Sequence, residues 1–61
     1  MPEHAHEFVV AVARHLGNRE LADKHALDVA RSIGWNVAEG FSKAEVEFVA
    51  NRIVALQRVS R

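Results

Sequence analysis

The sequence contains no cysteine and no tyrosine, and it has only one proline and three glycines among 61 residues. The absence of cysteine excludes disulfide bonds and removes the thiolate ligands of most structural zinc sites. A chain of this length buries only roughly 60% of the surface that its unfolded form exposes. We therefore expect its stability to come from regular helix packing, from self-association, or from both.

The chain also has no excess of charge and no long hydrophobic run. Eight Lys and Arg balance eight Asp and Glu, so no long-range field attracts nucleic acid or an anionic membrane, and self-association is permitted. No stretch reaches the ~18 to 20 apolar residues that span a bilayer. The start, Met1 to His4, lacks the basic region of a signal peptide. These features predict a soluble, cytoplasmic protein.

What is present is the composition of a globular domain, with 49% hydrophobic and 26% charged residues. Apolar residues recur with a period of ~3.6 in three segments, about 3–16, 19–33 and 42–59, which glycines separate. The sequence thus predicts one all-α domain over 1–61, a compact three-helix bundle. The predicted core stripes comprise Ala5, Phe8, Val9, Val12, Ala13 and Leu16; Leu21, Ala22, Ala26, Val29, Ala30 and Ile33; and Val46, Val49, Ala50, Ile53 and Leu56.

The helix boundaries carry local signals. Ser42 and Glu45 match the capping box, and Phe41 and Val46 occupy the positions of a hydrophobic staple, so the third helix is expected to begin at Ser42. Asn18 is an N-cap candidate for the second helix. Gly17 and Gly34 fit the positions after the first two helices, and Gly34 would fold Trp35 back toward Ala30.

The third segment carries one apolar stripe more than a simple bundle face needs. This second stripe lies roughly 120° or more around the helix from the core stripe. Two interpretations are open: a central third helix buries both stripes within the chain, or the second stripe is a surface for a partner or a dimer. Val10, off the core stripe of its own helix, modestly supports a partner surface. The candidate partner-binding residues are Ala44, Phe48, Ala55 and Val59, with Trp35 in the linker and Leu27 on the second helix.

Catalytic and metal signatures are weak. His4, His6, His15 and His25 include no pair with the i, i+4 spacing of helical zinc ligands. The best-placed hydroxyl, on Ser42, is assigned to capping, and no base or oxyanion donor accompanies the other serines. We therefore expect no enzyme, no metal site and no cofactor, and the sequence assigns no role to the four histidines.

One alternative comes from the segment Glu20 to Leu27, which resembles the first helix and turn of a helix-turn-helix, and from Arg52, Arg58 and Arg61 near the C-terminus. This resemblance implies a small DNA-binding regulator, which the zero net charge disfavours. The interpretation that the sequence favours is a helical interaction module, a regulator, inhibitor or adaptor. It would bind a protein partner and self-associate through the third helix.

Overall fold

The computed structural model describes residues 3–59, with only the backbone described at Glu3, Ala38 and Val59. It contains three α-helices, α1 (Glu3–Leu16), α2 (Arg19–Ser32) and α3 (Lys43–Val59), and a short 3-10 helix, η1 (Val37–Glu39), between α2 and α3. The predicted all-α class and the three-helix bundle are confirmed. The helix boundaries agree with the predicted ranges to within one residue.

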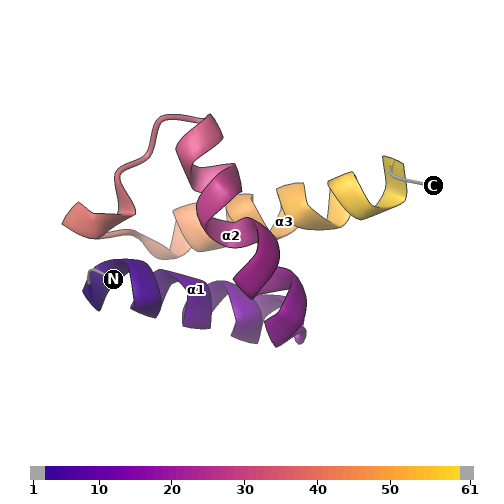
Figure 1. Ribbon diagram of the computed structural model, residues 1–61, viewed down its shortest axis with the longest axis horizontal. Helices are drawn as coiled ribbons and strands as arrows, with labels where there is room; N and C mark the ends of the chain where they lie inside the picture. Colours follow the sequence, from indigo (N-terminus) through magenta and orange to yellow (C-terminus); the bar gives the residue numbers. More distant parts are fainter. Residues whose placement is uncertain (1–2, 60–61) are drawn as a thin grey trace.

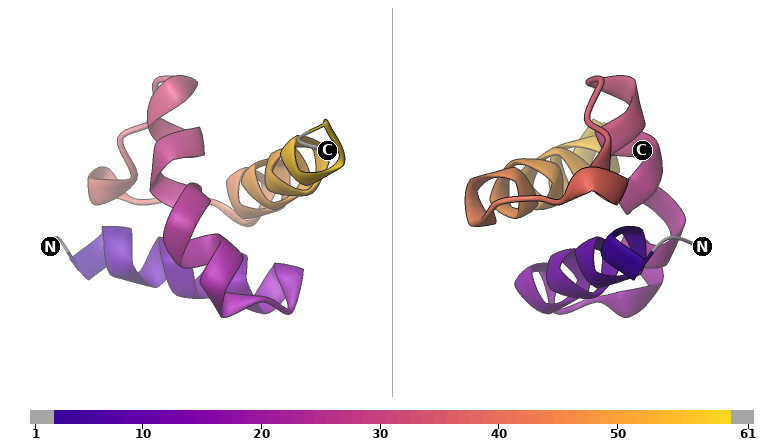
Figure 2. Two further views of the ribbon diagram at one scale, coloured as in Figure 1. Left: turned by 45° about the vertical axis from the view of Figure 1, so that its right-hand side comes forward. Right: turned by 90° about the vertical axis from the view of Figure 1, so that its left-hand side faces the viewer.

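The three helices pack against one another in every pair. In Figure 1, α1 and α3 lie one above the other, and α2 crosses in front of both; Figure 2 shows the same crossing from two further sides. The Cα radius of gyration is 10.5 Å, which is about the value expected for a compact chain of this length. One common core lies where the helices cross.

The core contains most of the residues that the apolar spacing predicts. The fully buried large side chains are Phe8 and Val12 on α1 and Val49 and Ile53 on α3, and small alanines of α2 fill the space between them. The buried set is Ala5, Phe8, Val9, Val12, Ala13, Ala22, Ala26, Val29, Ala30, Val37, Val46, Val49, Ala50 and Ile53. Leu16 and Leu21 are half-buried against it.

Two predicted core residues are exposed. Ile33 is 37% exposed because it is the C-cap of α2, where the chain leaves helical geometry. Leu56 is 39% exposed near the C-terminal end of α3, where the next residue, Gln57, still contacts His25 of α2. In both cases the periodicity gives an apolar position but does not show whether a neighbouring helix covers it.

The end of α2 has the predicted geometry. Gly34 has a φ of 83°, its N–H donates to the Arg31 carbonyl, and the Trp35 N–H donates to the Ala30 carbonyl, both at 3.0 Å. This pair of bonds is the Schellman motif, which satisfies two carbonyls at the helix end. It fixes the direction in which the chain delivers Trp35.

The starts of α2 and α3 are capped as predicted. The Asn18 side chain accepts a bond of 3.0 Å from the Leu21 N–H. At α3, the Glu45 N–H donates to the Ser42 hydroxyl at 3.2 Å, and the Ser42 N–H donates to the Glu45 carboxylate at 2.6 Å. These reciprocal bonds form the capping box.

The sequence predicted no regular structure for the linker between α2 and α3. In the structure, apolar contacts order it. Val37, the first residue of η1, is buried, and η1 packs against α1. Two residues after η1, the Phe41 ring meets the Phe8 ring edge-on, with centroids 5.2 Å apart. The linker therefore closes the core over α1 and sets the point from which α3 begins.

Candidate functional site

The second apolar stripe of α3 faces away from the core. Ala44, Phe48 and Ala55 are all exposed, whereas Val46, Val49, Ala50 and Ile53 on the other side of the helix are buried. Within residues 3–59, α1 and α2 therefore pack on the core side of α3 alone. We call Ala44, Phe48 and Ala55 the outward face. Val59 ends α3, but its side chain lies outside the described part of the chain.

Phe48 is the largest side chain of the outward face and is 50% exposed. The Trp35 ring packs against it edge-on, with the ring centroids 5.5 Å apart and the ring planes at 61°. This geometry is favourable for two aromatic rings. Because the Schellman bonds hold the backbone of Trp35, its ring and that of Phe48 form an ordered aromatic patch at the outward face.

The C-terminal turns of α3 carry two more exposed apolar residues, which by helical periodicity lie off the outward face. The α3 helix has 17 residues, against 14 in α1 and 14 in α2, and its end extends beyond both of them in Figure 1. Val54 and Leu56 are each 39% exposed there. The sequence analysis named neither as a candidate site residue. The greater length of the third segment could have indicated that its end extends past the other two helices.

Two other residues, which lie off the predicted core stripes, are half-buried within the chain. Leu27 is half-buried and packs against the core from α2. Val10 is half-buried on α1. The surface with the most exposed apolar area among the candidates is therefore on α3, with Trp35 beside it.

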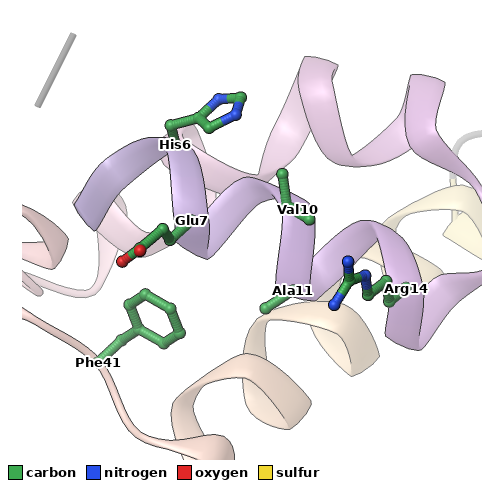
Figure 3. Close-up of a pocket in the computed structure, with 6 residues that line it drawn as sticks. All are labelled: His6, Glu7, Val10, Ala11, Arg14 and Phe41. Atoms are coloured by element: carbon green, nitrogen blue, oxygen red, sulfur yellow. The ribbon is translucent and has the colours of Figure 1, made fainter. Parts of the chain in front are cut away.

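A shallow depression of about 350 Å³ lies on α1 and is bordered by Phe41. Figure 3 shows that its polar side chains do not converge, because His6 lies on one side of α1 while Glu7 and Arg14 lie toward the other. A small-molecule site normally encloses its ligand and aims a few polar groups at it. The lining residues are His6, Glu7, Val10, Ala11, Arg14 and Phe41.

The histidines take separate places. His4 Nδ1 lies 3.3 Å from the Glu7 carboxylate on the same helix, and His25 Nε2 lies 3.4 Å from the side-chain nitrogen of Gln57, which links α2 to the exposed end of α3. In the described part of the chain, no three His, Asp or Glu side chains gather closely enough to hold a metal ion.

The segment that resembles a helix-turn-helix contains no turn. The α2 helix runs without a break from Arg19 to Ser32, so the chain does not bend at residues 26–28, where the motif would need its turn. Arg52 and Arg58 are exposed on α3, and Arg61 lies outside the described residues.

The chain matches no protein-family model, no curated protein and no solved structure. None of the helices in residues 3–59 is both long enough and apolar enough to cross a membrane. The function is therefore inferred from the geometry of the outward face.

Proposed function

We propose that this chain is a helical protein-interaction module, a regulator, inhibitor or adaptor that binds a protein partner and self-associates through the outward face of α3. One observation carries the proposal: Phe48 is held against Trp35 with half of its surface exposed, on a side of α3 opposite to the core. Aromatic side chains in ordered, apolar surroundings are the residues that most often anchor protein interfaces.

The free energy available from this surface is appreciable. A phenylalanine side chain presents about 200 Å², so the exposed half of Phe48 leaves about 100 Å², or roughly 2.5 kcal/mol at 25 cal/mol per Å², as an upper value for burial in an interface. Ala44 and Ala55 add little area themselves. Their small side chains instead let a partner approach the helix closely on either side of the Phe48 ring.

The test is a charge placed on the outward face, compared with the same charge elsewhere on α3. Phe48→Glu should abolish self-association and partner binding. Val54→Glu, on another exposed apolar residue of the same helix, should change both by less than about threefold, because it lies off the outward face. Sedimentation velocity measures self-association, and retention by immobilised wild-type chain measures the same contact independently.

Far-UV circular dichroism of both variants shows whether a loss of association results from unfolding. We expect the helical signal of Phe48→Glu to stay close to that of the wild type. Equal loss of association in both variants, or association that persists in Phe48→Glu, would contradict the proposal. Unfolding of Phe48→Glu alone would place Phe48 in the core.

A further inference from the structure

We infer that the partner on the outward face is a second copy of this chain, with the two α3 helices antiparallel about a twofold axis beside Asn51 and Arg52. This inference rests on the proposed function and specifies its occupant. It follows from the order of large, small and charged residues along α3, which an antiparallel second copy complements.

The sizes of the residues on the outward face fit an antiparallel second copy. Phe48 lies three residues before Asn51, and Ala55 lies three residues after Arg52, so a twofold axis between the two central residues places each Phe48 ring opposite the small Ala55 of the other chain. Ala44 and Val59 are likewise seven residues from the centre. A large residue facing a small one lets two helices approach closely with their side chains interleaved.

The charges along one edge of the outward face fit the same arrangement. Glu47 and Arg58 lie along the same edge of the outward face, by helical periodicity, and within residues 3–59 neither side chain has an ion-pair partner. They are eleven residues apart, about 16 Å along one helix, too far to pair within the chain. In the antiparallel arrangement each Glu47 lies within two residues, about 3 Å of axial offset, of Arg58 on the other chain. The twofold axis generates this ion pair twice.

A charge on the other edge of the outward face opposes association. Arg52 lies next to the twofold axis, so the two copies of its guanidinium come close together across the interface. This like-charge contact opposes association. Arg52→Gln is therefore expected to tighten the dimer by about two- to fivefold, whereas Arg14→Gln, at an exposed arginine of α1, should leave it unchanged.

The interface is small. One face of one helix with an adjacent tryptophan gives less than the roughly 800 Å² per partner of a standard stable complex. We therefore expect a dissociation constant of about 1–100 μM, and a dimer that forms and separates readily.

The experiment is a charge exchange between Glu47 and Arg58 in the full chain. Glu47→Arg and Arg58→Glu should each weaken the homodimer by about three- to tenfold, since each replaces two attractions with two repulsions. The double variant should return to within about twofold of the wild type. Mixing the two single variants should give a heterodimer about as tight as the wild type, because both of its charge pairs are then complementary.

Sedimentation equilibrium measures these constants, and Lys24→Glu, an exposed charge reversal on α2, controls for net charge. Glu47→Arg mixed with Lys24→Glu should show no preference for the heterodimer. The antiparallel register is overturned if Phe48→Glu abolishes the dimer while neither the double variant nor the mixture of single variants recovers wild-type affinity. That result leaves the outward face as the interaction surface. A chain that remains monomeric overturns self-association itself.

Discussion

The rotation of α3 about its own axis decides which of its residues face the core, and two adjacent residues test it. Ile53 is fully buried, whereas Val54 is 39% exposed. Ile53→Ala removes buried methyl and methylene groups and leaves a cavity, so we expect it to lower the free energy of unfolding by about 2–4 kcal/mol. Val54→Ala removes little buried surface and gains helix propensity, so it should change that free energy by no more than about 0.5 kcal/mol.

The size of the domain sets the scale of this comparison. At 0.05–0.15 kcal/mol per residue, a chain of this length has a free energy of unfolding of roughly 3–9 kcal/mol, so Ile53→Ala takes a large part of it. The milder Ile53→Val should cost about 1 kcal/mol and keeps the series measurable if Ile53→Ala unfolds.

The assay is urea denaturation followed by circular dichroism and by the fluorescence of Trp35, the only tryptophan in a chain without tyrosine. All variants are compared at one low protein concentration, because dimerisation adds to apparent stability. Equal losses at the two positions, or a larger loss at Val54, would refute the orientation of α3 and with it the outward face.

Three further changes have defined outcomes in the same denaturation assay. Gly34→Ala meets no steric obstacle but imposes a side chain on a φ of +83°, so it should cost about 1 kcal/mol, and a neutral result would contradict the Schellman geometry. Ser42→Ala removes one half of the capping box and should also cost about 1 kcal/mol, while Ser42→Thr should retain most of the stability. Asp23→Ala breaks the exposed 3.5 Å pair with Arg19 and should cost no more than about 0.5 kcal/mol, and a larger loss would show that this pair is structurally important.

The features that the sequence predicted well are those set by local chemistry. The capping box at Ser42 and the turn at Gly34 depend on hydrogen bonds between residues within five positions of each other, so short motifs are enough to locate them. The apolar period then gives the buried side of each helix, because that side must face the other two helices in any three-helix arrangement.

The errors arose near helix ends, where burial depends on which side chains of the neighbouring helices cover a residue. Leu56 is exposed near the end of α3, although the next residue, Gln57, still contacts His25 of α2, and Ile33 sits where α2 stops. The contact of η1 with α1 joins residues distant in sequence, which no local pattern encodes. The same holds for the Trp35–Phe48 contact, since periodicity placed Phe48 on the second stripe and the turn at Gly34 placed Trp35 near Ala30, without bringing the two rings together.

Self-association through the outward face of α3 is tested by the mass of the chain in solution. Sedimentation equilibrium over about 1 μM to 1 mM covers the range in which a one-helix interface should associate. We expect a mass that rises from 6.8 kDa toward twice that value for the wild type, and that stays at the monomer value for Phe48→Glu. A wild-type chain that remains at 6.8 kDa throughout would contradict self-association through the outward face of α3.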